Sequence, residues 1–348
     1  MVVTRTDLRH LIDVALERFL ASQRDHLDEG AHPLLDEIGA VVAAGGKRLR
    51  PTFCFWGYRA TGAAPSDEIV AASAALELVH TFALIHDDVM DRSEVRRGRP
   101  ATWKAFAGAS QGGRSDPQQM GVAAAVLTGD LALVLADRLL ASSGFASDVL
   151  ARARLRFDSM RAAAIAGQML DLDAAHLGRV TEGEARRIAT LKSGGYTVAY
   201  PLSIGADLGG DDPDVQRVLA GYGSPLGQAF QLRDDVLGVF GDPSITGKER
   251  DGDLREGKQT VLVARARATG TAAQVALLDR ALGRPDLTPD DADRLREVLR
   301  ETGALDHTLG LIADLAAEAR AALDAAVIGS EVADALTELA QDVSEREA

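Results

Sequence analysis

Residues 76–91 read LELVHTFALIHDDVMD, an apolar run that ends in three aspartates. Apolar residues recur within it at intervals of three and four, which is the spacing of an amphipathic α-helix. Residues 8–19 and 309–323 repeat this spacing, and the strong helix formers Ala and Leu dominate the apolar set. Runs of alternating β-branched residues bounded by turns, which indicate strands, are missing from the sequence. The chain is therefore predicted to be all-α, with ten or more helices.

The composition is that of an acidic globular protein. Its 348 residues carry 38 Lys and Arg against 52 Asp and Glu, which leaves a net charge of −14. Such a surface repels phosphate backbones, so no nucleic-acid partner is expected. Asp130 and Asp137 interrupt the most apolar stretch, so we expect no stable membrane insertion. The single cysteine, Cys54, excludes an internal disulfide framework and suits a reducing cytosol, which predicts a cytoplasmic protein.

Breaks between the helical segments are short and rich in Gly and Pro. Examples are residues 45–46, 108–121 and 241–257. None of them has the character of an interdomain linker, and no internal repeat of fixed period occurs. Residues 1–348 are therefore predicted to form a single domain.

Two apolar segments end in paired carboxylates, at residues 84–91 and 230–237. Asp87 and Asp91 are four residues apart, so they share one helix face about 6 Å apart. Like charges so placed destabilise a helix unless a cation joins them, and Mg²⁺ typically takes one or two protein carboxylates with water and phosphate oxygens. Asp88 points away from this face and has a supporting role. Either pair alone is ordinary helix-end surface; two pairs with basic residues nearby favour a metal–phosphate site.

Basic residues follow or precede these segments. Residues 92–100 (RSEVRRGRP) form an arginine cluster in an acidic chain. An Arg guanidinium binds phosphate oxygens through bidentate hydrogen bonds. Residues 45–51 (GGKRLRP) present three cations on a glycine turn, without the spacing of a nucleotide-binding loop. Lys192, Lys248 and Lys258 lie at predicted helix ends or in loops. Each lysine alone is more simply structural, because cations favour helix C-termini.

In combination and order, these motifs resemble the trans-isoprenyl diphosphate synthases. The resemblance uses residues 45–51, 84–100, 167–171, 192, 230–235 and 257–258, and covers a core of about residues 40–262. It implies a helical bundle around a deep central cavity, of the isoprenoid synthase type. It also implies a homodimer and an Mg²⁺-dependent prenyl transfer from an allylic diphosphate to isopentenyl diphosphate.

Carried over residue by residue, the resemblance assigns roles to the motif residues. Mg²⁺, as three ions with bound substrate, is held by Asp87, Asp91 and Asp234. The allylic diphosphate contacts Arg96, Lys192, Ser193, Gln231, Lys248 and Lys258. Isopentenyl diphosphate binds to Lys47, Arg50, His80 and Arg97. The catalytic set is Asp87, Asp91, Lys192, Asp234 and Lys258, with Asp171 in support.

The second acidic motif departs from the family pattern. The family usually has a third Asp four residues after the first, and this chain has Gly238 there. Asp242 lies eight residues beyond Asp234 and beside Pro243, which makes it a poor substitute. We expect Asp234 to bind metal alone, with water in the missing position.

The residues before the first motif bear on product length. Phe82 precedes Asp87 by five residues, about 7.5 Å along a helix, with the small Ala83 beside it. The simplest interpretation of a helical Phe is core packing. In this family, such an arrangement resembles geranylgeranyl diphosphate synthases, in which Phe82 would stop elongation. A farnesyl or longer polyprenyl diphosphate synthase, a class I terpene cyclase and a non-catalytic synthase partner remain alternatives.

Overall fold

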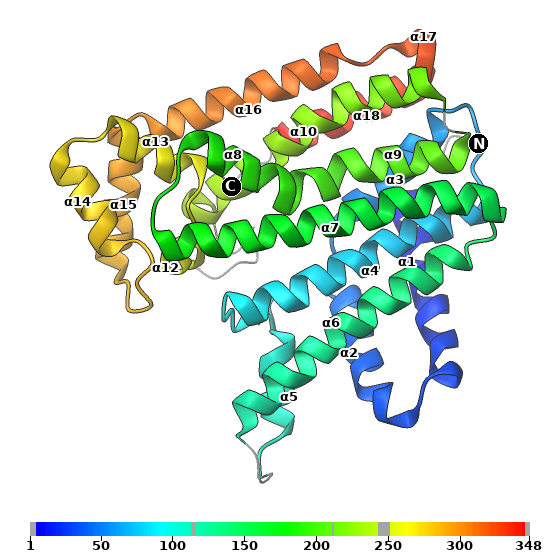
Figure 1. Ribbon diagram of the computed structural model, residues 1–348, viewed down its shortest axis with the longest axis horizontal. Helices are drawn as coiled ribbons and strands as arrows, with labels where there is room; N and C mark the ends of the chain where they lie inside the picture. Colours follow the sequence, from blue (N-terminus) through cyan, green and yellow to red (C-terminus); the bar gives the residue numbers. More distant parts are fainter. Residues whose placement is uncertain (1–4, 113–115, 211, 243–250, 345–348) are drawn as a thin grey trace. The chain divides into compact units, whose positions relative to one another are not determined.

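The computed structural model describes residues 5–112, 116–210, 212–242 and 251–344. Across these ranges the chain is helical nearly throughout (Figure 1). One short antiparallel hairpin pairs β1 (Val95–Arg96) with β2 (Arg99–Pro100). The prediction of an all-α chain with ten or more helices is therefore confirmed. The chain groups into two compact units, Met1–Arg154 with Ile204–Gly210 (unit 1) and Leu155–Ser203 with Asp211–Ala348 (unit 2). The single-domain expectation stays a prediction.

Unit 1 is built around α4 (Asp67–Met90), the helix that contains the decisive apolar run. Its side chains Ile69, Leu76, Leu78 and Ile85 are at most 1% exposed. It packs along α6 (Pro117–Ala141) and against α3 (Leu49–Arg59). The unit also contains α1 (Arg5–Gln23), α2 (His32–Ala43) and α5 (Thr102–Ala109), with two 3₁₀ helices (Arg24–His26 and Glu29–Ala31) between α1 and α2.

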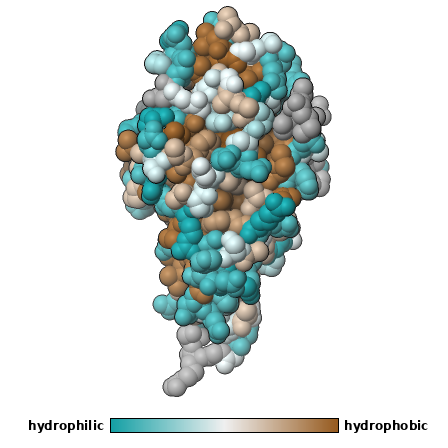
Figure 2. Space-filling model, turned by 90° about the vertical axis from the view of Figure 1, so that its right-hand side faces the viewer, coloured by the Kyte–Doolittle hydropathy of each residue, from teal (hydrophilic) through white to brown (hydrophobic). Residues whose placement is uncertain are grey.

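The two long helices of unit 1 are apolar as well as long. By length and composition, α4 and α6 are each long and apolar enough to cross a membrane. For α6 this differs from the expectation from sequence, which was that Asp130 and Asp137 interrupt its apolar stretch. The apolar window of α4 is 61% buried inside the protein, and that of α6 is 44% buried. The burial of α4 explains its hydropathy as that of a core helix. On the face drawn in Figure 2, hydrophobic patches are interrupted by hydrophilic residues.

Unit 2 is built around α10 (Pro213–Phe240). The helix begins at Pro213 because the Asp212 carboxylate accepts hydrogen bonds from the N–H groups of Asp214 and Val215. It packs against α16 (Ala304–Ala321) and a π-helix (Thr190–Ala199). Among the described residues, the other elements wholly within the unit are α8 (Glu182–Ala189), α12 (Gly252–Glu256), α13 (Val261–Thr269), α14 (Ala272–Ala281), α15 (Pro289–Glu301), α17 (Ala325–Ile328) and α18 (Ser330–Ser344). Two helices have residues in both units: α7 (Ser147–Leu177) and α9 (Tyr200–Gly209).

Glycines bring the main chains of unit 2 into direct contact around the π-helix. A Cβ atom on Gly194 would lie 2.4 Å from the carbonyl oxygen of Gly227 on α10. A Cβ atom on Gly167 of α7 would lie 2.2 Å from the backbone nitrogen of Lys192. Side chains cannot approach so closely, so only glycine fits at these positions. The contact fixes the segment that carries Lys192 and Ser193.

Candidate active site

The carboxylates of the first acidic motif lie at the C-terminal end of α4. Asp87 and Asp88 belong to its last turn, and the N–H of Asp91 caps the helix by donating to the carbonyl oxygen of Asp87 at 2.8 Å. The negative pole of a helix disfavours carboxylates, so this end needs compensating cations. Asp88 is buried, whereas Asp87 and Asp91 are partly exposed. The accessible pair is thus Asp87 and Asp91.

Arg96 on β1 supplies one compensating cation. Its Nε donates to Oδ1 of Asp88 at 2.8 Å, its Nη2 pairs with the same carboxylate, and Nη2 lies 3.8 Å from Oδ2 of Asp87. Burial opposes the guanidinium charge, but Asp88, Asp87 and Asp91 outweigh burial and raise the pKa of Arg96 above its ordinary value. Asp88 therefore holds Arg96 beside the accessible pair, which is a supporting position.

Arg48 anchors the glycine turn at residues 45–48. It has a positive φ of 50° immediately before α3, and its side chain is buried. Its Nε donates to Oδ1 of Asp13 on α1 at 2.8 Å. Its Nη1 donates to Oε1 of Glu77 on α4 at 2.6 Å, and its Nη2 donates to the carbonyl oxygen of Val42 at 2.7 Å. One side chain thus ties the turn to three helices of unit 1.

His80 on α4 lies within the field of the arginine cluster. Burial, with the positive charges of Arg50, Arg97, Arg96 and Arg48, lowers the pKa of His80 well below its ordinary value. The imidazole is therefore neutral at physiological pH, and the surrounding field stays positive. Such a field favours a polyanionic ligand.

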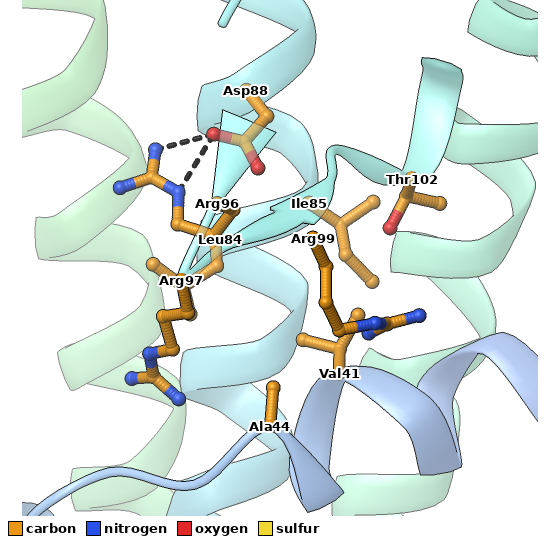
Figure 3. A pocket seen from close by; sticks show the side chains of 9 residues that line it. All are labelled: Val41, Ala44, Leu84, Ile85, Asp88, Arg96, Arg97, Arg99 and Thr102. Carbon is orange, nitrogen blue, oxygen red and sulfur yellow. Dashed lines mark hydrogen bonds and ion pairs between the residues drawn. The ribbon is translucent and has the colours of Figure 1, made fainter. Parts of the chain in front are cut away.

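A small pocket of unit 1 opens beside this cluster (Figure 3). The Arg96 guanidinium points to Asp88 there, and Arg97 extends in the opposite direction, towards Ala44. Arg97 donates from Nη1 to the carbonyl oxygen of Gly45, so the hairpin also holds the glycine turn. The full lining consists of Val41, Ala44, Leu84, Ile85, Asp88, Arg96, Arg97, Arg99 and Thr102.

Phe82 lies on α4 with its ring against His86. The ring centroids are 4.8 Å apart and the planes meet at 64°, an edge-to-face arrangement. His86 Nε2 lies 3.0 Å from the carbonyl oxygen of Val126 on α6. Phe82 and Ala83 are both partly buried. The phenyl ring is therefore held in place through a neighbour that bridges two helices.

The second acidic motif lies near the C-terminal end of α10, in unit 2. Asp234 is partly exposed, whereas Asp235 is buried and accepts a hydrogen bond from Nε2 of Gln231 at 2.7 Å. Burial raises the pKa of Asp235 to about 7, although the Gln231 hydrogen bond opposes this shift and the charge of Asp253 adds to it. Asp234 thus has the more accessible carboxylate of the two.

The lysines of unit 2 are paired with acids. Nζ of Lys192 donates to Oδ2 of Asp171 at 2.6 Å, so Asp171 stands in support of Lys192. Nζ of Lys258 lies 2.8 Å from both Oδ1 of Asp253 and Oε2 of Glu256. Both lysines are partly exposed, so their ammonium groups are oriented by the acidic partners and remain accessible from solvent.

The remaining predicted residues are placed as follows. Arg50 is buried at the start of α3, and Lys47 is exposed in the turn before it. Ser193 follows Lys192 on the π-helix, and Asp242 is exposed just beyond α10. Lys248 lies outside the described residues. Each motif is brought together with its own partners inside its own unit.

The oxygen donors of these motifs suit Mg²⁺. Among the residues with described structure, no three His, Cys, Asp or Glu side chains converge into a ready-made metal cluster. Mg²⁺ does not need one, because it typically takes one or two carboxylates and leaves its other positions to water and phosphate. The partly exposed Asp87, Asp91 and Asp234 fit that pattern.

Two contacts at these motifs were not predicted from sequence. Arg48 and Glu77 form a buried ion pair behind the glycine turn, and Asp253 pairs with Lys258. A charged residue inside the apolar run was the available signal for Glu77. For Asp253, the signal was its position five residues before a predicted ligand-binding lysine.

Comparison with known proteins identifies the family of this chain. Residues 32–301 match the polyprenyl synthetase family model. The chain is 34% identical to a geranylfarnesyl diphosphate synthase of Aeropyrum pernix over 77% of this chain and 79% of that protein. It is 31% identical to a geranylgeranyl diphosphate synthase of Methanosarcina mazei over 90% and 88%. A crystal structure of geranylgeranyl pyrophosphate synthase from Corynebacterium glutamicum, complexed with isoprenyl diphosphate and magnesium, matches with a TM-score of 0.92 at 33% identity, covering 98% and 99% of the two chains. This chain belongs to the polyprenyl synthetase family, and it is a trans-prenyltransferase.

Proposed function

We propose that this enzyme condenses an allylic diphosphate with isopentenyl diphosphate and makes geranylgeranyl diphosphate. The observation that carries the proposal is in unit 1: an accessible acid pair, Asp87 and Asp91, next to an arginine cluster around a neutral His80. Acids that hold cations, beside guanidinium groups that hold phosphate, suit a substrate with a diphosphate leaving group.

The difficult step is departure of the diphosphate from the allylic carbon. Asp87, Asp91 and Asp234 would hold three Mg²⁺ ions, which supply Lewis-acid neutralisation of the leaving group. Arg96, Lys192 and Lys258 are assigned as further positive charges for the allylic diphosphate, so the charge that develops on it is stabilised. Ser193, Gln231 and Lys248 complete the allylic diphosphate contacts.

The second substrate is held apart from the first. Lys47, Arg50, His80 and Arg97 orient the diphosphate of isopentenyl diphosphate, so that its double bond meets the electron-poor allylic carbon. A new carbon–carbon bond forms, and one proton then leaves the adjacent carbon. The released diphosphate accepts this proton, since it stays beside the new bond, and no protein nucleophile is required.

Product length is assigned to the residues below the acid pair. Phe82 is held by its edge-to-face contact with His86, and a fixed aromatic ring is a suitable stop for a growing chain. The names of the two relatives given above denote products of twenty-five and twenty carbons. A stop after three condensations from the five-carbon starter gives twenty carbons, which lies in this range.

We infer that the enzyme is a cytoplasmic homodimer. Apolar side chains on α6 support the dimer: Leu127 and Val134 are 56% and 54% exposed, and Met120, Val122 and Val126 are also exposed. A second copy against this face would cover them. Light scattering during size-exclusion chromatography tests the dimer, and a mass of one chain would reject it.

One assay tests the proposed reaction. Purified enzyme is supplied with Mg²⁺, labelled isopentenyl diphosphate and dimethylallyl, geranyl or farnesyl diphosphate, and the products are separated by chain length. A twenty-carbon diphosphate supports the proposal, and Asp87→Asn should lower its rate at least about a hundredfold. A cyclic hydrocarbon would identify a cyclase, and no turnover with any starter would identify a non-catalytic partner.

A further inference from the structure

The two acidic motifs differ at one position, one helical turn after their leading aspartate. On α4, Asp91 follows Asp87 by four residues, so both carboxylates come from the same helix face. On α10, the residue four after Asp234 is Gly238, which has no side chain. On the helix face of the leading aspartate, the second motif therefore offers one carboxylate where the first offers two.

A carboxylate from another helix occupies the space in front of Gly238. A Cβ atom on Gly238 would lie 1.7 Å from Oδ2 of Asp253 and 2.6 Å from its Cγ. Asp253 belongs to the first turn of α12, which packs against α10 within unit 2. A side chain at position 238 and the observed Asp253 carboxylate therefore exclude each other. The missing side chain is what allows Asp253 to reach this position.

Asp253 is held in this position from its own side. It is 8% exposed, its carbonyl oxygen accepts a hydrogen bond from the N–H of Lys258 at 3.1 Å, and its Oδ1 is 2.8 Å from Nζ of Lys258. Oδ1 thus faces the lysine while Oδ2 faces α10. The contact with Lys258 therefore fixes the orientation of the Asp253 carboxylate.

We propose that Asp253 serves as the second carboxylate of the α10 motif, acting with Asp234 towards the divalent cation. The inference rests on the proposed function, because that function places a Mg²⁺ ion at Asp234. It replaces the expectation that Asp234 acts with water alone. It also links the metal motif to Lys258, since one carboxylate contacts the lysine through Oδ1 and faces α10 through Oδ2.

The test compares two acids that both contact Lys258. Asp253→Asn keeps the shape and removes the charge that faces Gly238. Glu256→Gln is the matched control, because Glu256 also lies 2.8 Å from Nζ of Lys258, and a Cβ atom on Gly238 meets Asp253 rather than Glu256. Thermal unfolding is followed at increasing Mg²⁺ with a non-hydrolysable allylic diphosphate analogue present, which reports metal binding without turnover.

The proposal expects Asp253→Asn to raise the Mg²⁺ concentration at half-maximal stabilisation about tenfold, and Glu256→Gln to change it less than twofold. An unchanged midpoint for Asp253→Asn would overturn it, as would equal shifts in both variants, which would assign Asp253 to Lys258 alone. Circular dichroism confirms that each variant is folded.

A relocation variant gives a second measurement. Gly238→Asp combined with Asp253→Gly returns the carboxylate to α10 and frees the space that it needs. The proposal expects this double variant to recover a midpoint within about threefold of the wild type, while Gly238→Asp alone does not. If the double variant binds Mg²⁺ as weakly as Asp253→Asn, the proposal is wrong. Failure of the wild type to be stabilised by Mg²⁺ and analogue would instead count against the proposed function.

Discussion

The guanidinium of Arg48 and the carboxylate of Glu77 form an ion pair at 2.6 Å, with their side chains 3% and 4% exposed. Water cannot solvate either charge at that depth, so each depends on the other. Arg48 depends in addition on the Asp13 carboxylate and the carbonyl oxygen of Val42. The pair joins the glycine turn to α4, the helix that carries Asp87. The position of Lys47 and Arg50 thus depends on a contact behind them.

Removing the Glu77 charge should destabilise the fold. We expect Glu77→Gln to lower the free energy of unfolding by about 3 kcal/mol, because it leaves a buried guanidinium without its main counter-charge. Urea denaturation measures this loss. Glu94→Gln is the control, since Glu94 pairs with Lys104 at 2.6 Å but is 63% exposed, and such pairs contribute about 0–1 kcal/mol. Equal losses in the two variants would refute the role of the buried pair.

His80 should stay neutral where other imidazoles take up protons. The pKa of His80 is lowered in the folded protein. Below about pH 6.5 the unfolded protein therefore binds a proton at this imidazole, whereas the folded protein leaves it unprotonated. The unfolded state then binds more protons, and the His80 contribution to stability falls as pH drops below that value. NMR with labelled histidine, assigned through His80→Gln, should show no titration of this imidazole between pH 8 and 6. Titration near pH 6.5, as in urea-unfolded protein, would contradict the expectation.

Product length should respond to Phe82. Phe82→Ala removes the ring that we assign as the stop, so the variant should release products at least one five-carbon unit longer, with condensation retained. Chromatography of the products from farnesyl diphosphate measures the change. Phe19→Ala, on α1, serves as the control and should leave the distribution unchanged. An unaltered chain length in Phe82→Ala would remove Phe82 from this role.

Cys54 should be inert in the native protein. The residue is fully buried, and burial raises the pKa of its thiol to about 12, against a hydrogen bond with Ser73 that lowers it. At pH 8 the thiol is therefore almost entirely protonated, and the thiolate is the reactive form. Reaction with a disulfide reagent at pH 8 should therefore be negligible without denaturant and complete with it. Labelling at equal rates in both conditions would disprove this prediction.

Much of the fold was predictable from local pattern. The apolar spacing of residues 76–91 predicts α4, and the end of that run predicts where its acids lie. The π-helix at Thr190–Ala199 was not predictable, because it depends on main-chain contact with Gly167 and Gly227 from distant parts of the chain. Periodicity reports neighbours along one helix and carries no information about such contacts.

The contact partners of the motif residues could not all be predicted from the sequence either. Asp87 and Asp91 share a helix face, so spacing alone pairs them. Asp253 meets Gly238 through the packing of α12 on α10, which no spacing rule encodes. The sequence therefore shows that the carboxylate is missing at Gly238. Only the structure shows that the Asp253 carboxylate lies at that place.

The glycine contact around Lys192 has a consequence for how this enzyme can evolve. Every single substitution at Gly167, Gly194 or Gly227 adds atoms where main chains already touch, so no gradual path reshapes the backbone at the diphosphate site that we propose there. Selection for new products would then act on residues such as Phe82, which we propose as the stop for the growing chain. Under this restriction, related enzymes would differ in the chain length of their products and keep the same chemistry.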